Sequence, residues 1–372
     1  MNPLPFELQA QDGDARTGRL TTPHGVIQTP AFMPVATYGA VRGVDAVDLE
    51  NLGAEIALSN TYHLHERPGE TVIEGLGGLH GFTGWHRPWL TDSGGFQITS
   101  LADRVKVDEE GVTFASALDG TRRQLTPESV VEIQAALGSD IAMVLDECVP
   151  EAVADPARAA LAQARSLRWA ERARRSHVRK DQALFGIIQG GSSPALRRES
   201  ARETAALGFD GYAHGGLGLG ETNDARREAI YEAQGELPAA RPRYLMGLGK
   251  PEDLVRAIEC GVDLFDCVVP TRHARHGLLF TSEGQIVVRN ARFATDERAP
   301  DPNCDCPTCA RHSRAFLRHL LRSGESLGAR LASLHNLRFT LRLMERAREA
   351  IARGQFAALR DEIIGLADRR LG

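Results

Sequence analysis

The chain has 372 residues, of which 42% are hydrophobic and 25% are charged, and its formal net charge at neutral pH is −5. This composition is that of an ordinary globular protein. No stretch approaches the ~20 consecutive apolar residues that span a bilayer, and the N-terminus lacks the basic and then apolar segments of a signal peptide. We therefore expect a cytoplasmic protein with no membrane span.

Charge is distributed unevenly along the chain. Residues 301–372 hold 13 Arg against 8 Asp and Glu, a net charge of about +5, which leaves about −10 for residues 1–300. A basic end on an acidic body fits a local phosphate-binding face. Solvated helix faces explain the same charges equally well, so charge alone does not identify a nucleic-acid partner.

The first 30 residues combine glycines with short β-prone segments. Gly13, Gly18 and Gly25 separate these segments, a spacing typical of short strands joined by turns. We expect a small antiparallel sheet that caps the bottom of the fold predicted by the residues that follow.

Eight apolar runs of strand length come next and alternate with helical patterns. Near-continuous apolar strands separated by helices indicate a parallel sheet covered on both sides, and eight units predict an α/β fold closed into a (β/α)8 TIM barrel. The predicted strands are residues 30–36, 55–60, 88–92, 140–147, 183–189, 211–217, 243–249 and 264–270.

Two of the intervening helices carry clear end signals. One is expected to begin after Asp155, a preferred N-cap residue, with Pro156 at its first position. The other begins at Pro251 and ends at Gly261, a residue type that commonly terminates helices.

A hairpin and a C-terminal unit extend the predicted barrel. Residues 111–127 fit a hairpin inserted after the third strand and turning at Asp119-Gly120. Beyond residue 300 a cysteine-rich loop precedes amphipathic helices. We therefore predict a barrel with its cap and hairpin over residues 1–300, and a helical subdomain packed on it over residues 301–372.

Polar residues stand at the carboxyl ends of the predicted strands, where barrel enzymes carry their active sites. Asp92, Asp146 and Asp266 are three such residues, and Asp266 lies inside an apolar run, where an unpaired carboxylate is costly. Each alone fits a helix cap or a turn. Three acids converging on one mouth instead indicate a functional site. Asn60, Gln189, Gly215 and Gly216 complete the set.

The segments around these residues suit a flat heterocycle. In TDSGGFQ the glycines allow close approach of the backbone, and Phe96 can stack on a ring. Asp146 can accept hydrogen bonds from N1–H and the exocyclic amine of guanine, while Gln189 and the Gly216-Leu217 backbone can address the carbonyl side. These features favour a purine pocket.

The segment NCDCPTC predicts a metal site. Cys304, Cys306 and Cys309 have C-x-C-x2-C spacing, which is typical of metal binding rather than of a disulfide framework. Three thiolates and one imidazole form a closed, structural zinc site. His335 can supply the imidazole, and His312 is the rival ligand.

Seven segments together resemble the motifs of bacterial tRNA-guanine transglycosylases. They are TDSGGFQ, DEC, GIIQGG, GGLGLGE, YLMGLGKPEDL, FDCVVPTRHARHG and CDCPTC with a later HN, in order over about residues 5–352. The resemblance implies a zinc-bearing barrel enzyme with one structural Zn²⁺ per subunit, expected to form a homodimer. It also implies exchange of the wobble guanine of GUN-anticodon tRNAs for 7-aminomethyl-7-deazaguanine (preQ1), the queuosine precursor.

The resemblance also assigns roles to residues. Asp266 falls on the nucleophile and Asp92 on the general acid/base, so a covalent ribosyl–aspartate intermediate and double displacement are implied, as in retaining glycosidases. Cys304, Cys306, Cys309 and His335 fall on the zinc ligands. The implied substrate-binding residues are Asp92, Ser93, Phe96, Asp146, Cys148, Gln189, Gly216, Leu217 and Met246. The implied RNA-binding residues are Gly247, Leu248, Gly249, Lys250, Pro251, Glu252, Asp253, Thr271, Arg272, His273, Ala274 and Arg275.

The chain departs from this family at several positions. His273 and His276 stand where asparagine is common, His214 replaces an aliphatic residue, and Gly218 replaces alanine. We expect His214 to be a packed, neutral histidine. Leu219 is bulky where the queuine-using branch carries glycine, so we expect the small aminomethyl base to be the substrate.

Three alternatives to this function can be stated. His63 and His65 near a strand end, with His214 and Asp266, fit the catalytic metal site of a barrel amidohydrolase, although the strand positions differ from that pattern. A second alternative keeps the fold and inserts the base into DNA or another tRNA position. A third is a non-catalytic tRNA-binding partner subunit, against which Asp92 and Asp266 argue.

Overall fold

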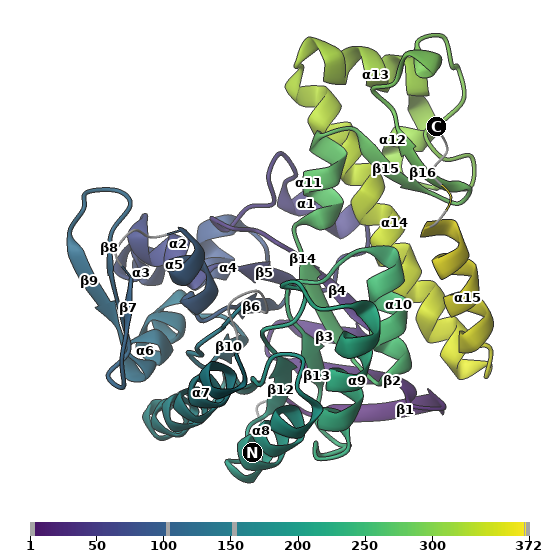
Figure 1. Cartoon of the computed structure of the whole chain (residues 1–372). Helices are drawn as coiled ribbons and strands as arrows, with labels where there is room; N and C mark the ends of the chain where they lie inside the picture. Colours follow the sequence, from purple (N-terminus) through teal and green to yellow (C-terminus); the bar gives the residue numbers. More distant parts are fainter. Residues whose placement is uncertain (1–3, 102–104, 151–154, 368, 370–372) are drawn as a thin grey trace.

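The computed structural model describes residues 4–101, 105–150, 155–367 and 369, and Figure 1 shows their arrangement. Eight parallel strands form one sheet in the order β4-β14-β13-β12-β11-β10-β6-β5, and a bridge between Val35 and Leu58 joins its two ends. The predicted barrel is therefore confirmed. Its strands are β4 (Ala31–Pro34), β5 (Ala57–Ser59), β6 (Trp89–Thr91), β10 (Ile141–Met143), β11 (Ala183–Ile188), β12 (Gly211–His214), β13 (Arg243–Leu245) and β14 (Leu264–Cys267).

Each predicted run contains one of these strands, but every strand is shorter than its run. All six residues of β11 are buried, as expected for a strand covered on both faces. The residues at the carboxyl ends of the runs leave the sheet, since they form the loops of the barrel mouth. The run over 264–270 ends differently, because Val269 and Pro270 already belong to a helix, α11 (Val269–Arg275).

Helices cover the barrel (Figure 1). The two helices with sequence signals begin where predicted: Asp155 accepts a hydrogen bond from the Arg158 backbone N–H at the start of α7 (Pro156–Ser176), and α10 begins at Pro251. The helices up to β14 are α1 (Ala46–Asn51), α2 (Thr61–Glu66), α3 (Glu70–Gly75), α4 (Gly78–Thr83), α5 (Gly95–Leu101), α6 (Pro127–Leu137), α7, α8 (Pro194–Ala206), α9 (Asn223–Gln234) and α10 (Pro251–Glu259).

The inserted hairpin is confirmed and has one strand more than predicted. It comprises β7 (Lys106–Val107), β8 (Val112–Ala115) and β9 (Arg122–Leu125), which pair antiparallel between α5 and α6. The turn between β8 and β9 contains Asp119 and Gly120, and the Gly120 N–H donates to the Ser116 carbonyl (2.9 Å). The hairpin projects from the left side of the molecule in Figure 1.

The predicted N-terminal cap lies at the amino ends of the barrel strands. It is a three-stranded antiparallel sheet of β1 (Phe6–Asp12), β2 (Ala15–Thr22) and β3 (Gly25–Thr29). Buried Arg16 donates to both oxygens of Asp263, the residue before β14 (Nε–Oδ1 2.9 Å, Nη2–Oδ2 2.5 Å). Because Asp263 also accepts the Arg243 N–H (2.7 Å), the cap is joined to two barrel strands.

The C-terminal region packs against α11 and the segment that follows it. Residues 274–293 share one hydrophobic cluster with α13 and α14, in which Leu279, Leu317 and Ala332 are fully buried. Our division of the chain at residue 300 stays a prediction, and its outer limits, residues 1 and 372, lie outside the described residues. The elements of this region are β15 (Leu278–Thr281), β16 (Gly284–Val287), a 3-10 helix (Ala291–Phe293), α12 (Pro307–Arg311), α13 (Arg314–Ser323), α14 (Ser326–Ala352) and α15 (Phe356–Ala367).

Candidate functional site

The three predicted acids lie at the carboxyl-terminal end of the barrel. Asp92 directly follows β6, Asp146 lies in the loop after β10, and Asp266 is the third residue of β14. Asp92 and Asp146 are each only 7% exposed. The negative charge of Asp266 contributes to a raised pKa of Asp92, so these two carboxylates are close enough to interact. The predicted convergence of acids on one mouth is thus present.

Asp92 is held by three donors. Its carboxylate accepts hydrogen bonds from Asn60 Nδ2 (2.5 Å), the Thr61 backbone N–H (2.9 Å) and Gln97 Nε2 (2.7 Å). Desolvation is the main cause that raises the pKa of Asp92 from 3.8 to about 6, with a smaller contribution from Asp266. A carboxyl group with a pKa near 6 can donate and accept protons near neutral pH.

Asp266 is oriented through a single oxygen. The Tyr244 hydroxyl (2.5 Å) and the Gly247 backbone N–H (2.8 Å) both donate to Oδ1. Desolvation raises the pKa of Asp266, and these two hydrogen bonds oppose the rise because they stabilise the carboxylate. Within the described part of the chain no hydrogen bond engages Oδ2, so this oxygen is free to meet a ligand.

Asp146 and Gln189 form a second polar group in the mouth. Gln189 Nε2 donates to Asp146 Oδ2 (2.5 Å), and Ser93 Oγ lies 3.4 Å from Oδ1. A Cβ atom on Gly216, whose φ is +68°, would lie 2.4 Å from Gln189 Oε1, and one on Gly215 would lie 2.7 Å from Nε2. A side chain at either position would therefore displace this amide, and the two glycines leave their backbone next to Asp146 and Gln189.

The remaining predicted substrate residues lie in the segments that follow barrel strands at the same mouth. Leu217 is buried after β12, Phe96 is 47% exposed at the start of α5, and Met246 follows β13. Cys148 is half-buried, and desolvation, with help from the charge of Asp146, raises the pKa of its thiol to about 12. Cys148 is therefore a neutral thiol close to Asp146 rather than a nucleophilic thiolate.

The predicted RNA-binding residues form two segments next to Asp266. Lys250 and Arg272 are exposed and Arg275 is half-buried, so cationic groups gather beside the mouth. His273 is also half-buried, and desolvation lowers its pKa, which favours the neutral imidazole. Whether any of the twelve residues contacts RNA stays a prediction. Among the other eight residues, Gly247 is exposed, and Glu252 and Asp253 are half-buried. The remaining five are buried: Leu248, Gly249, Pro251, Thr271 and Ala274.

Tyr244 is a site residue that our sequence reasoning missed. It is buried on β13, and its hydroxyl donates to the carboxylate of Asp266. Desolvation and the negative charge of Asp266 raise the pKa of Tyr244, so the phenol keeps its proton and remains a donor. The only sequence signal is its position in the predicted seventh strand, which is too general to single it out.

Arg197 is a second residue that the sequence did not reveal. It lies on α8, is fully buried, and donates to the backbone carbonyls of Ile188 (2.7 Å), Gly191 (2.9 Å) and Gly215 (2.9 Å). It thereby ties together the loops after β11 and β12, which carry Gln189 and Gly216.

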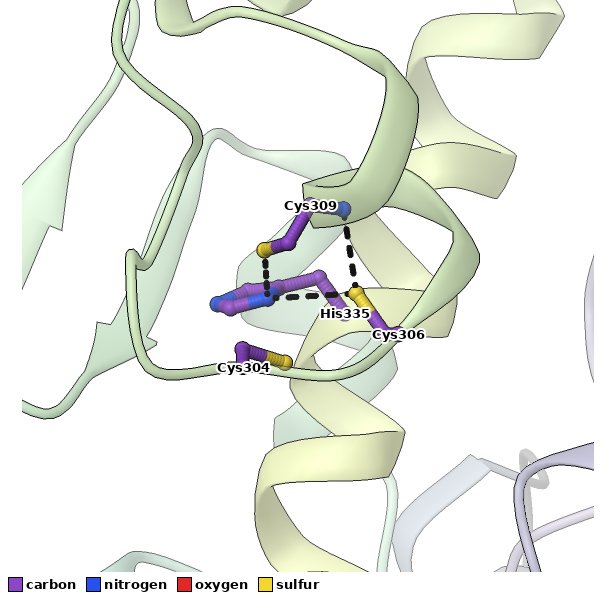
Figure 2. Close-up of side chains that lie close together, drawn as sticks. All are labelled: Cys304, Cys306, Cys309 and His335. Atoms are coloured by element: carbon purple, nitrogen blue, oxygen red, sulfur yellow. Dashed lines mark hydrogen bonds between the residues drawn. The ribbon is translucent and has the colours of Figure 1, made fainter.

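The predicted metal ligands come together as expected (Figure 2). The ligand atoms of Cys304, Cys306, Cys309 and His335 all lie within 4.8 Å of one another. His335 Nδ1 is 3.3 Å from Cys309 Sγ, while its Nε2 lies 2.7 Å from the Phe280 carbonyl. This contact leaves Nδ1 to face the thiols, an arrangement typical of metal-bound histidines. These residues form a candidate metal-binding site.

His335 rather than His312 is the histidine of this cluster. His312 lies outside the group and stacks on Phe316, with 5.3 Å between ring centroids. The spacing alone left both histidines open, and the long helix α14 brings the more distant one to the cysteines.

The amidohydrolase alternative is wrong. Within the described residues, His63, His65, His214 and Asp266 form no group with metal-binding geometry. His65 instead pairs with Glu70 (2.7 Å). His214 is fully buried, and desolvation lowers its pKa well below 6.5, so it is the packed, neutral histidine that we expected.

We expect Asp146→Asn to stabilise the fold at neutral pH. Desolvation raises the pKa of Asp146 from 3.8 to about 6, so between these values the folded chain binds more protons than the unfolded chain. Stability therefore falls as pH rises through this window, and removing the charge should recover up to about 3 kcal/mol at pH 7. Urea unfolding at pH 7 and pH 4 should show a gain that shrinks at the lower pH.

Asp296→Asn is the control, because it should change the stability of the fold in the opposite direction. The Arg298 guanidinium lowers the pKa of Asp296 to about 2, so its replacement should reduce stability at pH 7. A gain from Asp146→Asn that is equal at both pH values would contradict the desolvation argument.

The fold and site define a class: a (β/α)8 barrel enzyme with buried acids at its mouth and a separate Cys3His cluster. Comparison with known proteins is more specific. A family profile described as "Queuine tRNA-ribosyltransferase" matches residues 11–367. The queuine tRNA-ribosyltransferase of Thioalkalivibrio sulfidiphilus is 52% identical over 97% of both chains. That of Moorella thermoacetica is 54% identical over 92% of this chain and 91% of its own. That of Thermus thermophilus is 51% identical over 100% and 96%.

The chain belongs to the queuine tRNA-ribosyltransferase family. It is thus a tRNA-guanine transglycosylase, a pentosyltransferase that acts on tRNA and guanine-type bases in queuosine synthesis, and the resemblance noted in the sequence is confirmed. Within the part of the chain that the structure describes, no helix combines the length and the apolar character needed to span a membrane.

Proposed function

We propose that the enzyme exchanges the wobble guanine of GUN-anticodon tRNAs for preQ1 through a covalent intermediate on Asp266. One observation carries this proposal. Asp266 is anchored through Oδ1 and unengaged at Oδ2 within the described residues, and it interacts with Asp92, whose pKa near 6 suits proton transfer. Exchange of a base without ATP or a redox step requires a nucleophile that attacks the ribose and, close to it, a group that donates a proton to the leaving base.

The exchange takes two displacements at C1′ of the ribose. Asp266 forms a bond to C1′ as the glycosidic bond to guanine breaks, and Asp92 gives a proton to the leaving base. Asp92 then takes a proton from the incoming base, whose nitrogen attacks C1′ and releases Asp266. Two inversions retain the β-configuration. Tyr244 and the Gly247 N–H stabilise the carboxylate before attack and after release.

Base recognition is assigned to the second polar group. Asp146 accepts from N1–H and the exocyclic amine of the purine, and Gln189 with the backbone at Gly216 and Leu217 addresses its carbonyl oxygen. Phe96 and Met246 cover the two faces of the ring, while Ser93 and Cys148 border the pocket beside Asp146. Arg197 supports this role because it holds the loops of Gln189 and Gly216 together.

Recognition of tRNA is assigned to the cationic groups beside Asp266. The target base must leave the anticodon stack, at a cost of a few kcal/mol. Lys250, Arg272 and Arg275 offset that cost by contacts to phosphates and neighbouring bases, with the other residues of segments 247–253 and 271–275 shaping the surface. We also propose that the enzyme forms a homodimer and acts in the cytoplasm.

Zn²⁺ is the ion assigned to the Cys304, Cys306, Cys309 and His335 cluster. Three thiolates with one imidazole are a donor set that zinc prefers, and a closed set of four protein ligands is structural rather than catalytic. Bound zinc would hold the loop before α12 against α14 and take no part in the exchange.

Exchange of radiolabelled guanine into tRNA tests the proposal. A GUN-anticodon tRNA should become labelled, whereas the same tRNA with only its wobble guanine replaced should not. Labelling of the replaced tRNA, or of a DNA oligonucleotide, would overturn the assigned substrate.

The same assay tests the choice of base. Leu219 is half-buried next to the Gly216-Leu217 segment, where a bulky side chain leaves little room for the large substituent of queuine. Unlabelled preQ1 should therefore displace labelled guanine from tRNA efficiently, and queuine should do so poorly. Equal efficiency of the two bases would contradict the role of Leu219.

A further inference from the structure

A second cluster of metal-ligating side chains lies at the opposite end of the barrel from the proposed active site. It consists of His24, His80 and Asp140, whose ligand atoms lie within 4.8 Å of one another. His24 Nδ1 is 2.8 Å from Asp140 Oδ1, and His80 Nε2 is 3.3 Å from Oδ2. The two imidazole rings stack, with 3.5 Å between their centroids.

Three separate parts of the fold hold these side chains. His24 is in the turn between β2 and β3, where its backbone N–H donates to Thr22 Oγ1 (3.2 Å), and His80 is on α4. Asp140 directly precedes β10, and the Trp89 N–H at the start of β6 donates to its Oδ2 (2.8 Å). The carboxylate is therefore fixed by the barrel itself, and both histidines approach it from outside.

His80 is an unusual member of this group. Its side chain is 9% exposed, and its Nε2 is buried without a hydrogen bond, although a carboxylate oxygen lies 3.3 Å away. Buried polar atoms normally make hydrogen bonds, so an unsatisfied nitrogen within 4.8 Å of two other ligand atoms indicates a missing partner. A cation bound by the nitrogen lone pair would supply that partner.

The geometry points to a divalent transition-metal site formed by His24, His80 and Asp140. Two imidazoles and one carboxylate are ligands for Zn²⁺, Ni²⁺ or Co²⁺ rather than for Mg²⁺ or Ca²⁺, which prefer oxygen. With metal–ligand bonds of about 2.0–2.2 Å, ligand atoms around a tetrahedral ion lie roughly 3.3 Å apart. The two observed N–O separations of 2.8 and 3.3 Å are close to this value, and the two stacked imidazole rings, whose planes differ by 17°, would tilt apart so that both nitrogens face the ion.

The site is open to solvent on one side. The His24 side chain is 37% exposed, so an ion can enter there and water can complete its coordination. A bound ion would join the cap, α4 and the entrance of β10. It would stabilise the folded chain without touching the residues at the other end of the barrel.

Titration with Ni²⁺ tests this inference on tag-free protein whose Cys3His cluster keeps its own metal. Calorimetry should show one Ni²⁺ bound per chain, and Ni²⁺ should raise the midpoint of thermal unfolding. His24→Gln keeps a donor for Asp140 but loses the imidazole, so it should weaken Ni²⁺ binding by at least about tenfold. His319→Gln, which changes an exposed histidine on α13, should bind Ni²⁺ as the unaltered protein does.

A second measurement requires no variant. Diethyl pyrocarbonate acylates accessible imidazoles, and peptide mapping should show that Ni²⁺ protects His24 but not His319. Absence of Ni²⁺ binding, equal binding by the His24→Gln variant, or unprotected His24 would each overturn the site. Unchanged tRNA exchange in the Ni²⁺-bound protein would agree with the distance between this metal site and the proposed active site. If Ni²⁺ inhibited exchange equally in His24→Gln, the inhibition would come from Ni²⁺ bound elsewhere.

Discussion

Asp266→Asn should abolish both base exchange and the covalent tRNA adduct while the fold stays intact. An amide cannot attack C1′ and carries no charge to stabilise the oxocarbenium-like transition state, so the rate should fall by about 10³-fold or more. The carbonyl oxygen of the new amide can still accept hydrogen bonds from Tyr244 and Gly247, which preserves the local structure. Guanine exchange and denaturing gels that retain covalent tRNA would measure the two effects.

Two comparisons make this experiment specific. Asp181→Asn changes an exposed aspartate away from the mouth and should leave exchange unaltered. Tyr244→Phe removes one of the two donors to Asp266 and should slow exchange less than Asp266→Asn, because the carboxylate itself remains. If Asp266→Asn still trapped tRNA covalently, another side chain would be the nucleophile.

The barrel was predictable because its strands are buried on both faces and read as apolar runs. The strand ends were not, since the residues after Met143 and Leu245 are as apolar or as small as those within the ladder. The short strand β7 was missed for a related reason. Two residues, Lys106 and Val107, carry too little pattern, and their pairing depends on the neighbouring strand β8.

The acids of the mouth were predictable from position, whereas their partners depend on strand order. Tyr244 pairs with Leu264 in the register of β13 and β14, so it shares a face with Asp266 two residues further along. Tyr244 and Asp266 become neighbours only when β13 and β14 pair in the folded sheet. Arg197 illustrates the same limit, because an arginine on an amphipathic helix normally lies in solvent and this one is fully buried against three carbonyls.

The Cys3His cluster was predictable in part from the sequence and in part only from the packing of the helices. The cysteine spacing indicated a metal site directly but left His312 and His335 open. The family resemblance favoured His335, and the packing of α14 against α12 brings it to the cysteines. The His24, His80 and Asp140 group has no such spacing, since its members are far apart in the sequence and meet only when the cap closes the barrel floor.

Cys306→Ser should release the metal of the Cys3His cluster and loosen the loop that precedes α12. Serine is a poor zinc ligand, and structural zinc can contribute roughly 10–16 kcal/mol to ordering its site. Cys306 is also the N-cap of α12, where its sulfur accepts the Cys309 N–H (3.3 Å). Because serine is a good N-cap residue, the substitution removes the metal ligand and keeps the cap. Metal content per chain should fall from one to near zero, and hydrogen exchange should rise over residues 301–311.

Cys260→Ser provides the matched comparison, because Cys260 is buried (4% exposed) and belongs to no metal cluster among the described residues. It should lower stability modestly and leave metal content at one per chain. Guanine exchange in Cys306→Ser should decline with the folded fraction rather than beyond it, since the cluster takes no part in the chemistry. Unchanged metal content in Cys306→Ser would reassign the ligands, and a loss of exchange in fully folded protein would give the metal a role at the barrel mouth.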